Sequence, residues 1–331
     1  MYKAFKDFVF IIILGAVIPW SMISMIKQEY SSAVNLNNSS ATTTAETTAS
    51  TQNLVQNQAD FSVSVLMADG NVEILELDTY ITGVLLREMP MEFELEALKA
   101  QAVVARTYTL RRYNTGGKHA NAIVCTDSAC CQGYSTREEY LARGEDESSI
   151  DKARRAVEET KGKVIMYNGQ LAEATYFSCS GGMTEDAQAV WGAEIPYLTA
   201  VESPGEEDAT HYTDTIVMSD SDFAKKLGIN QNEISNDWIG EIDYTEGGGV
   251  NSIEISGKIY KGTDVRNLLS LRSTAFTITI LGNSVSITTK GYGHRVGMSQ
   301  YGADAMAVSG SDYKEIISHY YVGTELVDYA F

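Results

Sequence analysis

Hydrophobic and polar residues alternate across Phe61–Tyr80, with one break at the short sequence Ala68-Asp69-Gly70-Asn71. Alternation with a period of two is typical of a strand that buries one face, and an Asp-Gly pair suits the tight turn of a hairpin. The pattern therefore predicts that the folded region opens with two antiparallel strands.

A short helix is predicted next, over Thr79–Glu88, with Asp78 as its capping residue. Pro90 ends this helix because a proline pushes the residue before it into an extended conformation. Glu88 is therefore expected at the C-terminus of a helix, where its carboxyl group faces the negative end of the helix dipole.

A longer helix is predicted from the residues after Pro90 to about Arg112, because apolar and small residues recur there at intervals of three and four. This spacing indicates one buried face. Lys99 and Arg106 are seven residues apart, so we expect them to share another face of the helix.

Later stretches of the chain predict both strands and helices. Strands are predicted at Lys163–Asn168, Ala172–Phe177, Ile253–Tyr260 and Phe276–Thr289. Helices are predicted at Ser219–Leu227, Gln300–Ser309 and Tyr313–Tyr321. Because strands and helices are mixed without strict alternation, the expected fold class is α+β, with helices and antiparallel strands in one domain over residues 61–331.

The first sixty residues have a different character. Phe8–Ile26 holds nineteen residues without a charge, about the length that spans a bilayer, and the lysines before it favour a cytoplasmic N-terminus. A cleaved signal peptide is the alternative. Nineteen of the thirty residues at 31–60 are Ser, Thr, Asn or Gln, which is typical of a flexible linker. We therefore expect a cytoplasmic stub and membrane anchor at residues 1–30 and an extracytoplasmic domain after the linker.

The composition narrows the function classes. The chain carries 44 acidic residues against 25 Lys and Arg, a formal charge of −19, which argues against capture of nucleic acid or anionic lipid by the whole chain. The hydrophobic content of 44% is that of a globular protein. Four cysteines in 331 residues are too few for a disulfide scaffold.

Glu88 is the first candidate for chemistry. A carboxyl at a helix C-terminus has a raised pKa, which suits a general acid. Arg87, Lys99 and Arg106 would lower the pKa if they came close, so the direction of the net shift stays open. The alternative is a Glu88 that only binds backbone or pairs with an arginine.

Two polar, glycine-rich segments are further candidates. The first, TYFSCSGGMTE, delivers Ser178, Cys179 and Ser180 into a Gly-Gly turn that suits either a ligand loop or an ordinary strand exit. The second, GYGHRVGMSQYGA, places His294 among four glycines before a helix that contains Gln300. It lacks the fingerprint spacing of a nucleotide site.

A cluster of soft metal ligands lies within thirteen residues: His119, Cys125, Cys130 and Cys131. The spacing matches no standard zinc module, and adjacent cysteines point to opposite faces of an extended strand. Three interpretations stay open, namely a metal site, a disulfide from Cys125 to one of the adjacent pair, and free thiols.

Four segments together resemble the stage II sporulation protein D family, also called the SpoIID/LytB family. They are GVLLREMPMEFELEALKAQAVVARTYTL, YFSCSGGMTEDAQAVWGAEIPYLTAVESP, LRSTAFTI and GYGHRVGMSQYGADAMAVSGSDYKEIISHYYVGTEL, and they follow one another in the right order. The resemblance implies a membrane-anchored lytic transglycosylase that cuts the glycan strands of peptidoglycan during engulfment of the forespore. It also implies a position between the mother-cell and forespore membranes.

The resemblance assigns roles to particular residues. The glutamate of the Glu-Met-Pro motif is Glu88, and the basic residue of the ARTY motif is Arg106. Some similar proteins bind zinc through a Cys and a Cys-Gln pair, here Cys125 and Cys131, which leaves Cys130 or His119 as a fourth ligand. The chain departs from the usual pattern at Cys179 and at Arg295, where a glycine is usual.

The implied reaction needs one carboxyl group. Glu88 would protonate the glycosidic oxygen and then remove the proton of the C6 hydroxyl, which closes on C1 to give a 1,6-anhydromuramyl product. No second carboxylate is evident for hydrolysis, with Glu92–Glu96 the nearest acids in sequence. The residues expected to bind the sugars are Arg106, Lys99, Ser178, Cys179, Ser180, His294, Gln300 and Tyr301.

Three other functions remain as alternatives. The domain would be a glycan-binding activator of a cell-wall amidase, a zinc hydrolase, or a thiol enzyme that uses Cys179 with His294. The expected partners are peptidoglycan strands, a sporulation amidase and membrane proteins, and nucleic acid is not among them.

Overall fold

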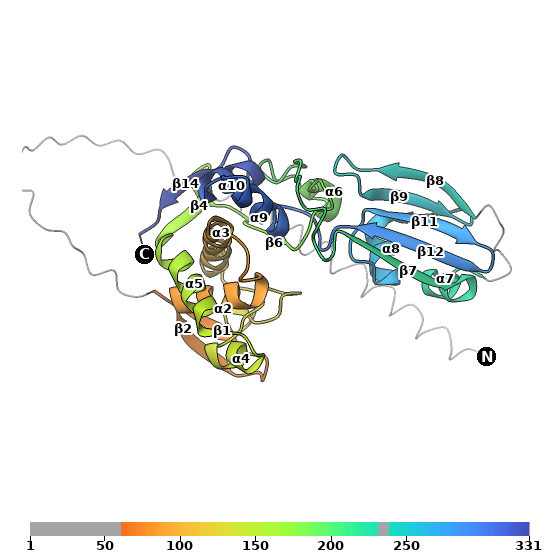
Figure 1. Cartoon of the computed structure of the whole chain (residues 1–331). Helices are drawn as coiled ribbons and strands as arrows, with labels where there is room; N and C mark the ends of the chain where they lie inside the picture. Colours follow the sequence, from red (N-terminus) through yellow and green to blue (C-terminus); the bar gives the residue numbers. More distant parts are fainter. Residues whose placement is uncertain (1–60, 231–237, 331) are drawn as a thin grey trace, which may run out of the picture. The chain divides into compact units, whose positions relative to one another are not determined.

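The computed structural model describes residues 61–230 and 238–330 of the chain (Figure 1). These residues belong to one compact unit, Asn57–Phe331. The predicted membrane anchor and linker lie outside the described residues, as does the alternative signal peptide. Among the residues that are described, no helix combines the length and the apolar character that a membrane span requires.

The domain opens with the predicted hairpin. Strands β1 (Ser62–Leu66) and β2 (Val72–Glu76) pair antiparallel, and β3 (Val124–Cys125) joins β1 in parallel. Val63 and Val65 of β1 face the core, so the predicted alternation is confirmed in β1. In β2 the apolar side chains of Val72 and Ile74 are exposed, so the prediction that alternation buries one face of this strand is wrong. The β3 pairing brings a segment sixty residues downstream to the start of the domain.

Helix α2 (Leu77–Glu88) starts two residues earlier than predicted and has a different cap. The side chain of Glu76 accepts hydrogen bonds from the backbone N–H groups of Asp78 and Thr79, so Glu76 caps the helix and the prediction for Asp78 is wrong. The helix ends at Glu88 as predicted, because Met89 before the proline is extended, at φ −114° and ψ 137°.

Helix α3 (Leu95–Asn114) is the predicted long helix, but it is buried on all sides through its middle. Figure 1 shows α3 within a group of helices. It packs against α2, α5, α9 and α10 and against β4. Small residues, Ala97, Ala100, Ala102 and Ala105, allow this close packing. The prediction of a single buried face was therefore too narrow.

The remaining elements of this first core all follow α3 in sequence, and they lie before and after residues 213–290. They are α4 (Arg137–Ala142), α5 (Glu147–Glu158), β4 (Lys163–Tyr167), β5 (Gln170–Leu171), β6 (Tyr176–Phe177), α6 (Ala187–Trp191), β13 (Met298–Ser299), α9 (Gln300–Val308), α10 (Tyr313–Tyr320) and β14 (Glu325–Asp328). Strands β14, β4 and β5 form one antiparallel sheet, and β13 pairs with β6 in parallel. The strand predicted over Ala172–Phe177 is formed only at its last two residues.

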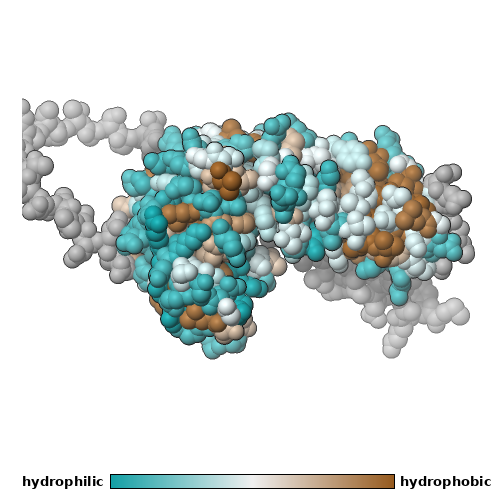
Figure 2. Space-filling model, in the orientation of Figure 1, coloured by the Kyte–Doolittle hydropathy of each residue, from teal (hydrophilic) through white to brown (hydrophobic). Residues whose placement is uncertain are grey.

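A second hydrophobic core is built by residues 213–290. Its elements are β7 (Thr213–Ser219), α7 (Asp220–Leu227), β8 (Ile239–Tyr244), β9 (Val250–Ile255), β10 (Lys258–Lys261), α8 (Gly262–Leu269), β11 (Phe276–Leu281) and β12 (Ser284–Lys290). They form two antiparallel sheets, ordered β10-β9-β8 and β11-β12-β7. Figure 2 shows hydrophobic residues gathered on the surface of this region, where Val217, Ile259 and Leu281 are exposed.

Two of the predicted single strands are hairpins. The stretch Ile253–Tyr260 turns back at Gly257, and Phe276–Thr289 turns back at Gly282, each with a positive φ that glycine adopts freely. The α+β class, with mixed helices and antiparallel strands, is confirmed.

Candidate functional site

A cavity of about 640 Å³ collects residues from distant parts of the sequence. Its wall contains the end of α2, two residues of α3, the loop at 128–131, the segment 173–178, the end of α6 and residues 292–294. Of the predicted site residues, Glu88, Cys130, Cys131, Ser178, His294 and Gln300 line it. The structure thus brings together residues from all four candidates singled out in the sequence.

Glu88 is half-buried in this wall, and its environment decides the direction of its pKa shift. Burial raises the pKa of the Glu88 carboxyl, and this effect is larger than the opposing ones from a Gly133 hydrogen bond and from the charge of Arg87. The backbone N–H of Gly133 donates to Glu88 Oε1. A Cβ at position 133 would lie 2.6 Å from this oxygen, so the contact requires glycine.

Lys99 and Arg106 do not reach the cavity. Arg106 is fully buried, and its guanidinium donates to the carbonyl oxygens of Thr160 at 2.8 Å and Val157 at 3.2 Å and pairs with Asp78. Lys99 pairs with Glu96 of α3 and with Glu159, the C-cap residue of α5. This geometry gives neither residue a contact with a ligand beside Glu88, so the predicted sugar contacts of both find no support here.

The polar loop after β6 contains one half-buried residue, Ser178, and two buried ones. Ser178 lines the cavity, whereas Cys179 and Ser180 are buried and turn toward the carboxylate of Glu206. Oε2 of Glu206 accepts from Cys179 Sγ at 3.2 Å, from Ser180 N and Oγ at 2.8 Å each, and from Gly181 N at 3.0 Å. Glu206, which the sequence analysis missed, holds the loop in shape.

The thiol of Cys179 is unsuited to nucleophilic catalysis. Burial, together with the negative charge of Glu206, raises its pKa to about 12. A thiol with this pKa stays protonated near neutral pH, and its proton is donated to Glu206. This environment argues against the alternative in which Cys179 acts with His294.

His294 is a neutral part of the cavity wall. Burial and the nearby charge of Arg266 lower its pKa to about 4. A hydrogen bond with the Tyr176 backbone has the opposite effect on the pKa but is the weaker influence. Its Nδ1 accepts from the Val296 N–H at 3.1 Å. The centroid of its ring lies 5.4 Å from that of Trp191 and 5.6 Å from that of Phe177. We therefore expect His294 to shape the cavity rather than to transfer protons.

Gln300 and Tyr301 differ in their access to the cavity. Gln300 is only 5% exposed, lines the cavity, and its Nε2 has no hydrogen-bond partner among the described residues. An unpaired amide donor of this kind suits a carbonyl oxygen of a ligand. Tyr301 packs its ring against Phe93 at 4.9 Å and does not line the cavity, so its predicted sugar contact finds no support.

Several lining residues were missed by the sequence analysis. They include Tyr108, Arg112, Lys118, Glu173, Tyr176, Trp191 and Tyr292. Glu173 supplies a second carboxyl to the described lining, not Glu92–Glu96 as considered from sequence. Its two oxygens are engaged by Arg111, at 2.7 Å, and by Arg112. No local signal marks Glu173, because its partners lie about sixty residues away.

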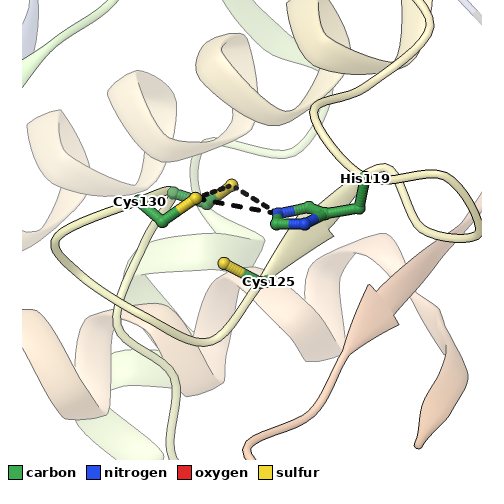
Figure 3. Close-up of side chains that lie close together, drawn as sticks. His119, Cys125 and Cys130 are labelled. Carbon is green, nitrogen blue, oxygen red and sulfur yellow. Dashed lines mark hydrogen bonds between the residues drawn. The ribbon is translucent and has the colours of Figure 1, made fainter. Parts of the chain in front are cut away.

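The four predicted metal ligands converge beside the cavity (Figure 3). One ligand atom from each of His119, Cys125, Cys130 and Cys131 lies within 4.8 Å of the others. Both adjacent cysteines reach the cluster because the chain turns there, with the N–H groups of residues 130 and 131 donating to Asp127 O. All four cysteines of the chain are free thiols.

The spacing of this cluster fits a tetrahedral metal. Around Zn²⁺, ligand bond lengths predict about 3.8 Å between two sulfurs and about 3.5 Å between a sulfur and a nitrogen. The structure has 3.9 Å between Cys130 Sγ and Cys131 Sγ, and 3.8 Å and 3.5 Å from these sulfurs to His119 Nε2. The residues present therefore fit a zinc ion.

The chain is similar to known sporulation proteins. Residues 68–167, which contain Glu88 and the His/Cys cluster, match the SpoIID family, described as stage II sporulation protein. The chain is 39% identical over 261 residues to stage II sporulation protein D of Bacillus amyloliquefaciens, covering 77% of this chain and 75% of that protein. The same protein of Bacillus subtilis (strain 168) is 38% identical over 264 residues, covering 78% and 76%.

A more distant similarity extends to another protein of Bacillus subtilis (strain 168). The amidase enhancer of this organism is 29% identical over 302 residues, which cover 75% of this chain and 40% of that protein.

Proposed function

This chain belongs to the stage II sporulation protein D family, and on that basis we propose that it is a peptidoglycan lytic transglycosylase. It would cleave the bond between MurNAc and GlcNAc in the glycan backbone during forespore engulfment. The observation that carries the proposal is a half-buried carboxyl with a raised pKa, that of Glu88, in the wall of a cavity formed by the family motifs.

Glu88 supplies both proton transfers in the proposed reaction. Its protonated carboxyl donates to the glycosidic oxygen while the bond from this oxygen to C1 breaks. The resulting carboxylate takes the proton of the C6 hydroxyl, and the C6 oxygen forms the new bond to C1. Gly133 stabilises the ionised state between the two transfers because its N–H donates to Oε1.

The other lining residues support sugar binding. Trp191 is 42% exposed at the cavity and offers an apolar ring face to a pyranose, and Tyr292 is exposed to the same degree. Gln300 offers its unpaired amide to an acetamido or lactyl carbonyl, and Ser178 offers a hydroxyl. These groups bind and orient the substrate, whereas proton transfer is left to Glu88.

The state of Glu173 favours cyclisation over hydrolysis. A hydrolase needs a second carboxylate that is free to activate water or to attack the sugar. Both oxygens of Glu173 are held by arginines, and its backbone N–H donates to Tyr197 Oη at 2.7 Å. Glu173 is therefore assigned to the support of the cavity wall.

We assign a structural zinc site to His119, Cys125, Cys130 and Cys131. Four protein ligands complete a tetrahedron and leave no open position for water, which is the pattern of structural rather than catalytic zinc. When bound, the ion would supply fixed geometry to the loop that continues to Gly133. The zinc-hydrolase alternative is disfavoured for the same reason.

The location and partners follow the same proposal. We place the N-terminal segment in the membrane through Phe8–Ile26 and the catalytic domain outside it, between the mother-cell and forespore membranes. Peptidoglycan strands are the substrate, and a cell-wall amidase and sporulation membrane proteins are the proposed partners. The linker at 31–60 gives the domain reach from the membrane.

The second candidate function is a glycan-binding activator of an amidase. It is favoured by the similarity to a protein named amidase enhancer. Mass spectrometry of peptidoglycan digested with the purified chain distinguishes the two, with intact and with stem-peptide-free peptidoglycan as substrates. We expect 1,6-anhydromuramyl ends. Reducing muramic acid ends would contradict cyclisation, and an absence of cleavage together with stimulation of an added amidase would favour the activator.

A further inference from the structure

Arg295 occupies an unusual backbone position directly after His294 of the cavity wall. Its φ is +66°, in the left-handed region that favours glycine, and its side chain is only 2% exposed. A buried guanidinium on a strained backbone persists only where the surrounding structure holds it. The side chain must therefore provide contacts that a glycine at this position would not.

The guanidinium of Arg295 is almost fully paired. Nε donates to Ser180 O at 2.7 Å, and Nη2 donates to Met183 O at 2.7 Å and to Gly247 O at 2.6 Å. Nη1 pairs with Glu185 Oε1 at 3.2 Å. One side chain thus joins the turn after β6 to the loop between β8 and β9, which are sixty residues apart in sequence.

Glu185 completes this network from the other side. Its side chain is 1% exposed, and its Oε1 also accepts from Thr245 Oγ1 at 2.8 Å and from Gly249 N at 2.9 Å. A Cβ at Gly249 would lie 2.2 Å from Oε1, and one at Gly247 would lie 2.3 Å from Thr184 O. The loop comes this close to the ion pair only because these positions are glycine.

We propose that Arg295 and Glu185 form a buried clamp that positions the substrate-binding wall of the cavity. Arg295 directly follows His294, and its own carbonyl oxygen accepts from Glu185 N at 2.5 Å. Through Ser180 the same side chain holds the turn that begins at Ser178. Both wall segments are therefore fixed to each other and to the loop at 245–249. Arg295 and Glu185 are positioning residues, since neither lines the cavity.

The existence of the clamp does not depend on the proposed function. Only the identity of the ligand, a peptidoglycan glycan, rests on the proposed function. Glu88 lies on α2 and makes none of these contacts, so loss of the clamp should change substrate affinity more than proton transfer. A purely structural role would instead lower the melting temperature and leave the affinity of the folded protein unchanged.

Hydrogen exchange read by mass spectrometry tests the clamp without any ligand. Arg295→Gly removes the guanidinium and relieves the left-handed backbone, so the variant should fold. We expect amides of residues 178–185, 245–249 and 293–298 to exchange at least tenfold faster than in the wild type. Ser270→Gly is the matched control, because Ser270 has a φ of +57° at the end of α8 and does not line the cavity. Exchange as slow as in the wild type would overturn the clamp.

Glycan affinity then tests positioning. In a Glu88→Gln background, binding of a soluble MurNAc-GlcNAc tetrasaccharide should weaken about tenfold with Arg295→Gly and less with Arg295→Lys or Glu185→Gln, which keep part of the network. If the amides of Arg295→Gly exchange faster but the affinity for the tetrasaccharide is unchanged, the positioning role is overturned. If Glu88→Gln alone binds no glycan, the proposed function fails, while the exchange result still decides whether the clamp exists.

Discussion

The backbone N–H of Gly133 donates a hydrogen bond to Oε1 of Glu88, across 45 positions of sequence. Gly133 comes two residues after Cys131, so the loop that carries the His/Cys cluster also holds the proposed catalytic carboxyl. The fold therefore connects the proposed metal site to the proposed catalytic carboxyl.

Replacement of Glu88 by glutamine should abolish glycan cleavage. Gln cannot donate and retrieve a proton at the glycosidic oxygen, so we expect kcat to fall by at least a thousandfold, while glycan affinity stays within threefold. Cleavage is measured by release of anhydromuramyl products. Glu92→Gln, at an exposed position, serves as the control and should retain activity. A Glu88→Gln variant within tenfold of the wild type would refute the assignment.

The raised pKa of Glu88 also predicts a dependence of stability on pH. Because the folded state binds this proton more tightly than the unfolded state does, unfolding free energy falls as pH rises from the unfolded pKa through the folded pKa. A tenfold difference in proton affinity between the folded and unfolded states corresponds to about 1.4 kcal/mol of unfolding free energy. Glu88→Gln should therefore be more stable than the wild type above this window and lose that advantage below it. Chemical denaturation from pH 3 to 8 checks the sign, and a variant that is less stable at pH 8 than the wild type would contradict it.

Removal of zinc should lower the thermal stability of the domain. An ion bound to His119, Cys125, Cys130 and Cys131 stabilises only the folded state, so a chelator should lower the melting temperature, and added zinc should restore it. Cys125→Ser should reproduce the effect and should not be rescued by zinc. The purified protein should contain one zinc per chain by elemental analysis. A preparation without zinc, or a disulfide within the cluster, would exclude this site.

Cys179 should be dispensable for catalysis. Cys179→Ser keeps a donor to Glu206, so we expect kcat within threefold of the wild type and little change in stability. Because burial and Glu206 hold the thiol pKa at about 12, iodoacetamide should leave Cys179 unmodified in the folded protein at pH 8. If Cys179→Ser loses activity at an unchanged melting temperature, the result would support the alternative in which the Cys179 thiol is catalytic.

Trp191 should contribute to substrate affinity. Removal of its exposed ring by Trp191→Ala should raise KM about tenfold with kcat within threefold, and Trp191→Phe should restore part of the affinity. Tyr244→Ala is the matched control, because Tyr244 is an exposed aromatic residue at the end of β8 and does not line the cavity. An equal effect of both substitutions would show that the ring at 191 has no specific part in binding.

Local sequence was sufficient for features that depend on neighbouring residues. The first hairpin, the end of α2 before Pro90 and the extent of α3 follow from periodicity and from the restriction that proline imposes. The same holds for the candidate residues Glu88, His294 and Gln300, which stand in recognisable motifs and line the cavity. Local patterns fail at Gly257 and Gly282, where a continuous run of strand residues hides a turn.

Only the tertiary structure decided which side chains share one environment. The direction of the Glu88 pKa shift depends on burial by segments far away in sequence, and Arg106 is withdrawn from the cavity by carbonyl oxygens at positions 157 and 160. Glu206 and Glu173 carry no local signal, because the partners that define their roles lie 25 and 62 positions away. Arg295 stands out in the sequence as a departure from the family pattern, but its pairing with Glu185 spans 110 positions. Periodicity records which face of an element is buried, whereas the pKa and the pairing of a charged group depend on the atoms that surround it.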